Sequence, residues 1–532
     1  MQKKNLFAIA ILMLCTLFVF TGCKEIMSNL DDPVSSYFEL KENSTTVYLG
    51  QTYKIEYSTI SDAKDKVTFE VIDNKNVASV DAKGVVTGLS KGTAKIKVTL
   101  PASDYYQGAT KEFTVTVDAL LGLKEGKTTS VMLSKGKVYD LGVIAPEGST
   151  PTYVPSNDNV AVDANGVVTA QKYGDATVTV SVTAYGRSES LKFDIKVRVQ
   201  TETELNNIIT AAAGGDGKVQ VMLKDGFELE NDLNLEGKKI ELDLMNSILT
   251  FKGNQSFIIS DNFTLKNAKI DASNSSVQLV KMTNNNTVLG TVKKNGEVYT
   301  LAGKNDFYYI EKIIIDKVWV KNLKSDLITN QNIIWAVDNF TIKNSIIQAN
   351  YTGGSSSVIW LGSNNTNQGS IHNMDVDGNI FYNIYEDKTK GTQRFISIGN
   401  SSNAIKAWGT TAAGGDGTPA TAGSMMDWKF NNNICINVGY NKFGNNVPST
   451  NKNMKMEGKD NIFYDVRQIF NFFTAQNVKT TTGNKIWCPN VGVNTTDITR
   501  TDSNGNKLAV EEDPGITVPT EPLDLVNGVV VK

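Results

Sequence analysis

Few side chains in this sequence could act as an acid, a base or a charge-neutralising group. Among the 53 basic residues only five are arginines, and the chain of 532 residues has a single histidine, His372. Histidine is the usual acid–base residue near neutral pH, and arginine is the usual clamp for carboxylate and phosphate groups. The composition therefore disfavours many enzyme classes. A net charge of −3 without a basic block also argues against nucleic acid as a partner.

One segment could support the chemistry of a polysaccharide lyase. Such an enzyme removes a proton next to a uronate carboxylate and needs a cation to neutralise that carboxylate. Arg394 lies close in sequence to Lys388 and Lys390, and this cluster is the best lyase candidate. A solvated loop is the alternative that we favour. His372 precedes Asn373 at a turn, where we expect it to make a structural hydrogen bond.

Asp375 and Asp377 lie on one side of an expected strand and could form a carboxylate pair or a Ca²⁺ site. The aligned positions on neighbouring strands hold Lys343 and Lys429. Charges that alternate in this way are typical of a solvated ladder of ion pairs. We therefore predict no metal, no other cofactor and no catalytic residue, and an enzymatic function is disfavoured without being excluded.

Three large aromatic residues recur at the third position of an expected strand. They are Tyr308, Trp335 and Trp360, in the segments 306–310, 333–337 and 358–362. The segment 469–473 continues the series, with Phe470 and Phe472 at its second and fourth positions. If the second and fourth positions point inward, the third position faces solvent. Stacked about 4.8 Å apart on successive coils, these rings would form the kind of apolar surface that marks a contact site. Two alternatives are a covering loop, or a register shifted by one residue that buries the rings.

A fourth aromatic residue, Trp408, lies in the Gly/Ala/Thr-rich stretch 400–424. A loop of this kind could cover the aromatic residues, or it could close over a bound chain. Because sugar rings stack on Trp and Tyr faces, Tyr308, Trp335, Trp360 and Trp408 are the predicted glycan-binding residues.

The strands that must position these side chains follow a repeated six-residue pattern. Asn262–Asn267 and Asn339–Asn344 are nearly identical, and looser copies begin at residues 312, 373, 427 and 453. Each copy has apolar residues at its second and fourth positions; the pairs are Phe263/Leu265, Ile313/Ile315, Phe340/Ile342, Met374/Val376, Trp428/Phe430 and Met454/Met456. This alternation predicts strands with one buried face. Recurrence every 26–30 residues, with longer gaps as insertions, is typical of a right-handed parallel β-helix.

Two further features fit this architecture. The asparagines that follow the strands suit turns with left-handed backbone geometry. An amphipathic helix over residues 202–213 is expected to cap the first coil and to hide its open edge.

A longer repeat precedes this region. Residues 76–98 and 159–180 share the motif Val-Asp-x-x-Gly-Val-Val-Thr, in which Gly84 and Gly166 supply the positive φ of a hairpin turn. Short alternating strands over about 80 residues predict a small β-sandwich for each copy. The pattern resembles the bacterial Ig-like domains of the group 2 type, over about residues 34–200. Two such modules in tandem usually act as a stalk.

The N-terminus has the features of a secretory signal: Lys3 and Lys4, an apolar run over residues 6–20, and small residues before Cys23. The ending Phe-Thr-Gly-Cys resembles a bacterial lipobox, which implies that Cys23 is lipidated. An ordinary signal peptide is the alternative. The acidic segment that follows resembles the surface-export signals of Bacteroidetes lipoproteins, which implies a lipid-anchored protein on the outer face of the outer membrane. Cys435 and Cys488 then remain as expected buried free thiols.

The predicted fold class is all-β, with two Ig-like β-sandwiches followed by a right-handed parallel β-helix. The expected divisions are a signal peptide at 1–23, a tether at 24–33, Ig-like domains at 34–118 and 119–200, and the β-helix at 201–532. The last of these resembles the pectate-lyase-like superfamily, particularly its Bacteroidetes branch attached to surface lipoproteins. The chain as a whole is similar to accessory surface glycan-binding proteins.

That resemblance implies a protein that captures a polysaccharide or oligosaccharide for a SusC/SusD-like importer. A polysaccharide lyase of the pectate-lyase-like fold is one alternative, and an adhesin for a host protein is another. The sequence leaves open which glycan is bound and whether residues 501–532 cap the helix or extend from it.

Overall fold

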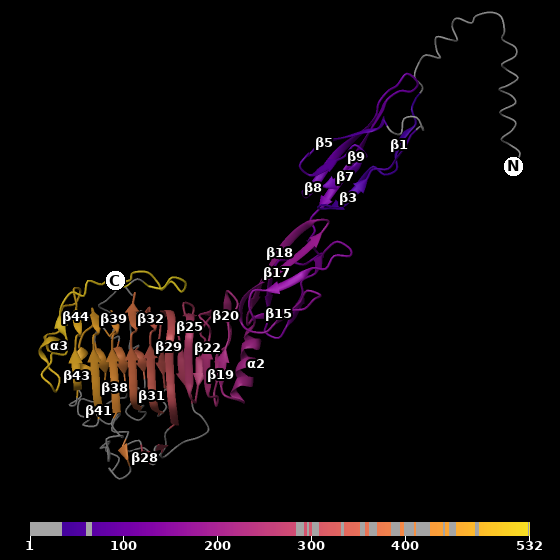
Figure 1. Ribbon diagram of the computed structural model, residues 1–532. Coiled ribbons are helices and arrows are strands. Elements are labelled where there is room, and N and C mark those ends of the chain that lie inside the picture. Colours follow the sequence, from indigo (N-terminus) through magenta and orange to yellow (C-terminus); the bar gives the residue numbers. More distant parts are fainter. Residues whose placement is uncertain are drawn as a thin grey trace, which may run out of the picture. The chain divides into compact units, whose positions relative to one another are not determined.

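The computed structural model describes residues 35–59, 66–283, 292–294, 297–300, 308–330, 335–351, 357–360, 370–384, 394–397, 409–410, 426–439, 442–445, 454–473, 478–529 and 531. The chain divides into two compact units, with the boundary in sequence between Lys196 and Val197 (Figure 1). Both units consist almost entirely of β-strands, so the predicted all-β class is confirmed. In the described ranges, no helix is both long and apolar enough to cross a membrane.

The first unit contains two modules of the same topology. Each has a four-stranded, a three-stranded and a two-stranded sheet. In the first module these are β2 (Ser44–Tyr48), β9 (Ala109–Asp118), β8 (Gly92–Leu100) and β5 (Thr68–Asp73); β3 (Thr52–Lys54), β7 (Val85–Gly88) and β6 (Ala78–Val80); and β1 (Phe38–Leu40) with β4 (Tyr57–Thr59). In the second they are β11 (Ser130–Leu133), β18 (Arg187–Val197), β17 (Gly174–Ala184) and β14 (Thr152–Pro155); β12 (Val138–Asp140), β16 (Val167–Ala170) and β15 (Val160–Val162); and β10 (Gly122–Leu123) with β13 (Val143–Ile144).

The repeated motif forms the same hairpin turn in both modules. Gly84 has a φ of 76° and Gly166 a φ of 79°, as the sequence predicts. In the first module Asp81 Oδ1 accepts the backbone N–H groups of Lys83 and Val85, both at 2.8 Å. These bonds satisfy turn backbone that the sheet leaves unpaired. The turn therefore sets the register of β6 against β7 and of β15 against β16.

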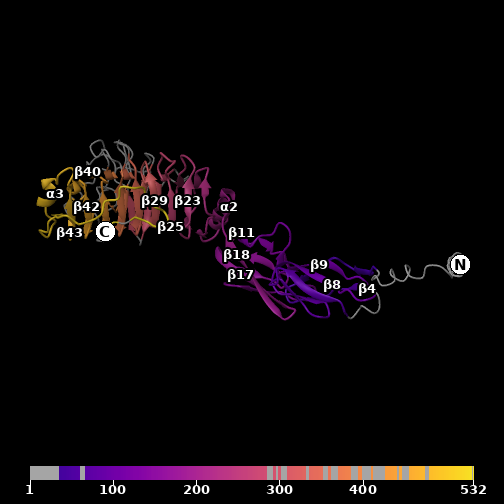
Figure 2. The same ribbon diagram turned by 90° about the horizontal axis from the view of Figure 1, so that it is seen from above.

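The second unit begins with α2 (Glu202–Ala213), which Thr201 caps by accepting the N–H of Glu204 at 3.2 Å. Parallel strands follow in three columns (Figures 1 and 2). Column 1 is a 7-stranded sheet: β21 (Leu233–Leu235), β24 (Phe257–Ile259), β26 (Val280–Met282), β30 (Ile328–Thr329), β33 (Ser357–Trp360), β36 (Arg394–Ser397) and β40 (Lys442–Asn445).

Columns 2 and 3 belong to one 17-stranded sheet. Column 2 contains β19 (Lys218–Gln220), β22 (Ile240–Asp243), the first parts of β25 (Phe263–Asp271) and β29 (Tyr308–Leu323), β31 (Trp335–Lys343), β34 (Ser370–Asp377), β38 (Met426–Asn431), β41 (Met454–Lys459) and β43 (Val478–Thr482). Column 3 contains β20 (Phe227–Leu229), β23 (Ile248–Phe251), the last parts of β25 and β29, β32 (Ile346–Ala349), β35 (Ile380–Asn383), β39 (Ile434–Ile436), β42 (Ile462–Tyr464), β44 (Lys485–Trp487) and β45 (Val510–Glu511).

The chain passes from column 1 to column 2 to column 3 in each coil and then starts the next coil. This arrangement of parallel strands is consistent with the predicted β-helix. The six-residue repeats all lie in column 2, where Phe263 pairs with Ile313, Ile313 with Phe340, and Phe340 with Met374. The apolar side chains of these repeats that the structure describes are buried, as the alternation predicts.

The last repeat is displaced by two residues from its predicted register. Trp428 pairs with Met456, and Phe430 pairs with Gly458. The expected partners were Met454 and Met456. Glycine is required opposite Phe430 because a Cβ at position 458 would overlap the Phe473 ring.

A second sequence interpretation fails at the next coil. The segment 469–473 was expected to be a strand with Phe470 and Phe472 inward. Instead Ile469–Asn471 forms the short 3₁₀ helix η4, and Phe470 is half-buried with the Arg500 guanidinium 5.0 Å from its ring centroid. Backbone N–H groups of Gln468 and Phe470 donate to buried Asp497 of α3 (Thr495–Thr499), which holds this segment out of a ladder.

Residues after β45 run back along column 3, an outcome that the sequence left open. Leu523 and Leu525 are buried and pack with Trp319, Ile346 and Ile380 on the outward side of that column. Figure 1 shows this C-terminal segment in yellow along the strands. It therefore covers apolar side chains that three-column winding alone would leave in water.

One corner between column 3 and column 1 contains a buried acid. Asp326 is only 4% exposed, and its Oδ1 accepts the N–H of Ser357 at 2.8 Å. Burial raises the pKa of Asp326 to about 7. The protonated carboxyl is thus favoured in the folded chain far above the pH at which it ionises in the unfolded chain.

Substitution of Gly458 tests the displaced repeat. We expect Gly458→Ala to lower the free energy of unfolding by about 1–3 kcal/mol, because the new methyl group must displace the Phe473 ring in a packed core. Denaturant unfolding measures the change. Gly253→Ala is the control, since its Cβ would meet no atom closer than 3.5 Å. Equal stability of the two variants would contradict this packing.

Substitution of Asp326 tests the buried acid. The folded state binds the proton more tightly than the unfolded state, so wild-type stability falls as the pH rises from about 4 to about 7. Asp326→Asn keeps the acceptor for Ser357 but cannot ionise. We expect the variant to gain up to about 4 kcal/mol relative to wild type over this interval. Unfolding curves at several pH values measure it, with exposed Asp104→Asn as control; parallel wild-type and Asp326→Asn profiles would contradict the assignment.

Candidate functional site

The predicted aromatic residues do not form a single exposed column. Tyr308 and Trp335 are paired first residues of column 2 strands, whereas Trp360 ends a column 1 strand and pairs with Thr329 and Ser397. Trp335 is fully buried, and Tyr308 and Trp360 are half-buried. The tilted rings of Tyr308 and Trp335 have centroids 5.2 Å apart at 40°. The expectation that all three rings face solvent side by side is therefore wrong.

The error has a local cause: neighbouring column 2 strands each contain one residue that the ladder pairing skips. Strict alternation places Ile334 and Ala336 inward with Phe340. In the structure Val337 and Phe340, which are three residues apart, are both buried. The alternation of inward and outward side chains therefore reverses at Asp338. Asp338 is skipped in the pairing of β29 with β31, and His372 is skipped in that of β31 with β34. Upstream of this position the opposite set of side chains, including Trp335, points inward.

The skipped positions hold a polar network inside the column 1–column 2 edge. The His372 Nδ1 lies 2.8 Å from Asp338 Oδ1, and the Tyr309 hydroxyl donates to Asp338 Oδ2 at 3.4 Å. His372 is 4% exposed and Asp338 is 1% exposed. The expected hydrogen bond of the histidine is present, and its partner is a buried carboxylate from the neighbouring coil.

The chemistry of this network favours a structural role. Burial first, and Asp338 second, raise the pKa of Tyr309, so its hydroxyl keeps its proton at neutral pH. Asp338 and His372 are not accessible to a polymer in this conformation. Among the lyase candidates, Arg394 is half-buried at the start of β36, where burial lowers its pKa. Lys388 and Lys390 lie outside the described residues.

The carboxylates on β34 belong to a charge ladder. Asp375 Oδ2 lies 2.6 Å from Lys343 Nζ, and Asp377 Oδ1 accepts from Asn432 Nδ2 at 2.8 Å. These contacts match the alternation of charge in the sequence. Within the ranges that the structure describes, no group of three or more His, Cys, Asp or Glu side chains is placed to hold a metal ion.

The column 1–column 2 edge carries the longest insertions between strands. The chain leaves Met282 of β26 and returns at Tyr308, and it leaves Ser397 of β36 and returns at Met426. Parts of the two insertions pair in a three-stranded sheet of β27 (Val292–Lys294), β28 (Glu297–Thr300) and β37 (Gly409–Thr410). Tyr299 of β28 is opposite Thr410 of β37. Trp408, next to β37, lies outside the described residues, as do Cys23 and the tether 24–33.

Both expected thiols are present as free, buried cysteines. Burial raises the pKa of Cys435 and of Cys488. Sequence reasoning missed Tyr309 and Asp338, which lie just before two of the aligned repeats. The signal was available in the alignment, because Glu311, Asp338 and His372 occupy the same position relative to each repeat.

Comparison with known proteins identifies one part of the chain. Residues 36–109 match the model of the family described as bacterial Ig-like domain (group 2). The resemblance inferred from the repeat is thus confirmed for the first module. No curated protein matches the chain.

Solved structures with similarity cover about a third of the chain. Domains 4 and 5 of the S-layer protein SbsC are 19% identical, with 31% of this chain and 99% of that chain covered and a TM-score of 0.18. EC1-2 of human protocadherin-24 is 15% identical, covering 31% and 99%, with a TM-score of 0.15. Extracellular domains 3–5 of Drosophila OTK are 10% identical, covering 31% and 62%, with a TM-score of 0.16. TM-scores this low support no argument about fold or function.

A double-mutant cycle tests the buried network. We expect His372→Ala and Asp338→Ala each to cost about 1–3 kcal/mol of unfolding free energy, because each leaves the other partner of a buried hydrogen bond unsatisfied. The double variant should cost at least about 1 kcal/mol less than the sum of the two. Thermal and denaturant unfolding measure the cycle. The exposed pair Lys252 and Glu230, 2.6 Å apart, is the control; additive effects at His372 and Asp338 would contradict the network.

Proposed function

We propose that this protein is a lipid-anchored surface protein that binds a polysaccharide at the column 1–column 2 edge of its β-helix. In this proposal Cys23 carries the anchor and the Ig-like modules serve as a stalk. Glycan capture would then supply a SusC/SusD-like importer at the outer membrane.

The observation that carries the proposal is the placement of half-buried aromatic rings at this edge. Tyr308 rests against buried Trp335, which holds its ring in a defined orientation. Trp360 ends a strand at the same edge, within the next two coils. A rigid ring that is part buried and part accessible suits stacking on a sugar, since little side-chain entropy is lost on binding.

The insertions add support. Two long segments leave the same edge at β26 and β36, and they pair through β28 and β37. Long loops placed on a rigid scaffold are where binding residues concentrate. Trp408 borders the paired segment in sequence and remains a predicted contact.

A lyase has less support from the described residues. The acid–base groups at the edge, Asp338 and His372, are buried in a hydrogen-bonded network, and Tyr309 is held protonated by burial. An adhesin remains the third hypothesis and predicts adhesion that does not depend on glycan.

Calorimetry of the mature protein with a glycan panel tests the proposed site. We expect Tyr308→Ala with Trp360→Ala to weaken binding of the recognised glycan by about 10-fold or more, the equivalent of about 1.4 kcal/mol. Trp335→Ala is unsuitable here, because removing a fully buried Trp costs about 3–5 kcal/mol of stability. The variant with Tyr308→Ala and Trp360→Ala leaves the buried Trp335 ring in place.

Tyr464→Ala with Trp487→Ala is a matched control. These half-buried residues face one another on adjacent coils of column 3, so the same residue types are removed from another face. Unchanged affinity in the Tyr308/Trp360 variant, or an equal loss in the control, would refute the site. New ultraviolet absorbance from unsaturated uronate products would instead establish the lyase.

A further inference from the structure

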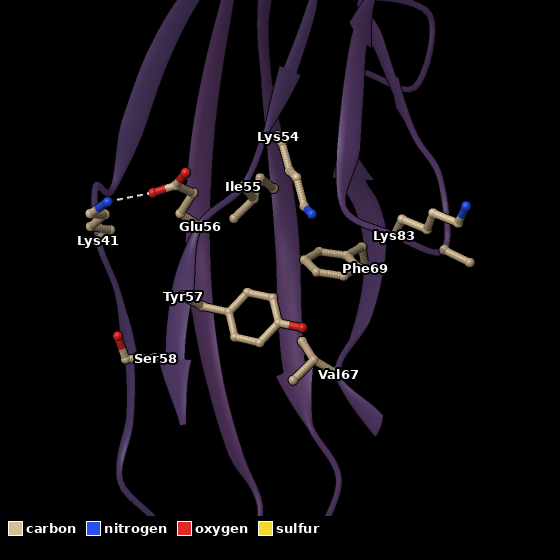
Figure 3. Close-up of a pocket in the computed structure, with 10 residues that line it drawn as sticks. Lys41, Lys54, Ile55, Glu56, Tyr57, Ser58, Val67, Phe69 and Lys83 are labelled. Carbon is tan, nitrogen blue, oxygen red and sulfur yellow. Dashed lines mark hydrogen bonds and ion pairs between the residues drawn. The ribbon is translucent and has the colours of Figure 1, made fainter. Parts of the chain in front are cut away.

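The first Ig-like module contains a pocket that the stalk role does not use. Its volume is about 580 Å³, within the range of about 300–1,000 Å³ typical of small-molecule sites. The rings of Tyr57 and Phe69 line it, with centroids 6.0 Å apart at 54° (Figure 3). Both side chains are half-buried. The pocket therefore has an apolar, aromatic wall of limited mobility.

The rim of this pocket is positively charged. Lys41, Lys54 and Lys83 line it and are exposed, whereas Glu56 is its one acidic side chain. Lys41 Nζ lies 2.6 Å from Glu56, and this hydrogen bond lowers the pKa of that carboxyl (Figure 3). Across the described residues, Lys54 and Lys83 have no carboxylate within ion-pair distance. The lining thus has an excess of two positive charges, from three lysines and one glutamate.

The second module shows that the fold does not require these residues. Its turn glycine, Gly166, lies against Tyr153 as Gly84 lies against Phe69. The N–H of Lys124 bonds the carbonyl of Gly142 as that of Lys41 bonds the carbonyl of Glu56. These contacts align the two modules residue by residue around the pocket.

Three of the pocket residues that differ between the modules are Lys54, Lys83 and Tyr57. Lys54 pairs with Val85 in β7, and its counterpart pairing with Val167 is Asp140. By the same alignment Asn165 replaces Lys83, and Val143 replaces Tyr57. The second module keeps the sandwich and its turn while losing the unpaired lysines and one ring. The pocket chemistry is thus a property of the first module alone.

We propose that this pocket binds an anionic saccharide unit, a uronate or a sulfated sugar within a polysaccharide. The sugar ring stacks against Tyr57 and Phe69, and its carboxylate or sulfate accepts hydrogen bonds from Lys54 and Lys83. An aromatic wall selects for a ring over a free inorganic anion, and two unpaired ammonium groups select for an anionic sugar over a neutral one. This second site is independent of the proposed site on the β-helix.

The test uses the mature chain that already carries Tyr308→Ala and Trp360→Ala, so that the β-helix site cannot supply the signal. Calorimetry is run with oligogalacturonate, chondroitin sulfate oligosaccharide, neutral cello-oligosaccharide and inorganic sulfate. The pocket variant is Lys54→Asp with Lys83→Asn, which introduces the residues of the second module and so preserves its fold. Lys91→Asp with Lys111→Asn is a control of equal charge change at exposed positions of the same module.

We expect one of the two acidic oligosaccharides to bind and the neutral one not to bind. The pocket variant should lose at least about 10-fold in affinity, Tyr57→Val should also weaken binding, and the charge control should leave it unchanged. The proposal fails if neither acidic oligosaccharide binds, if the control loses as much as the pocket variant, or if inorganic sulfate binds as tightly as the saccharide. Folding of each variant is checked by its unfolding transition.

Discussion

The second unit depends on a stack of buried asparagine side chains where column 2 turns into column 3. Asn379, Asn433, Asn461 and Asn484 are each at most 2% exposed. The Oδ1 of each of the last three accepts the N–H of the asparagine one coil earlier, at 2.9–3.1 Å. The Nδ2 donates to a carbonyl at the end of a column 2 strand, as from Asn433 to Val376 at 2.9 Å. The stack therefore satisfies buried turn backbone that would otherwise cost about 1–3 kcal/mol per group.

This constraint decides where the chain is free to vary. Residues next to the stack adopt left-handed geometry in coil after coil, at Asn344, Gly378 and Asn432. A corner of this kind admits no insertion, because an added residue would take the amide away from its partners. The corner from column 1 to column 2 has no such stack among the described residues, and both long insertions occur at this corner. The half-buried aromatic rings and the Asp338–His372 network lie at that same edge.

The first unit separates fold from surface chemistry in a different way. Its two modules have the same sheet topology and the same Asx turn, at Asp81 in the first and Asp163 in the second. Buried positions and turn residues repeat because they determine the sandwich. The exposed lysines at positions 54 and 83 of the pocket do not repeat. A tandem repeat thus provides an internal comparison, in which any difference that leaves the fold intact is available to function.

The sequence alone determined the elements that depend on local pattern: the strands of column 2, the left-handed asparagines, the hairpin turns, the capping helix and the free cysteines. Each follows from residues close together in the chain. Tertiary structure alone decided that Trp335 is buried, that Tyr308 and Trp360 lie in different sheets, and that residues after 511 run back over column 3. Alternation predicts side-chain direction only while every residue takes its place in the ladder. Asp338 is skipped by the ladder and reverses this alternation, and the groups that stabilise it, Tyr309 and His372, come from other coils.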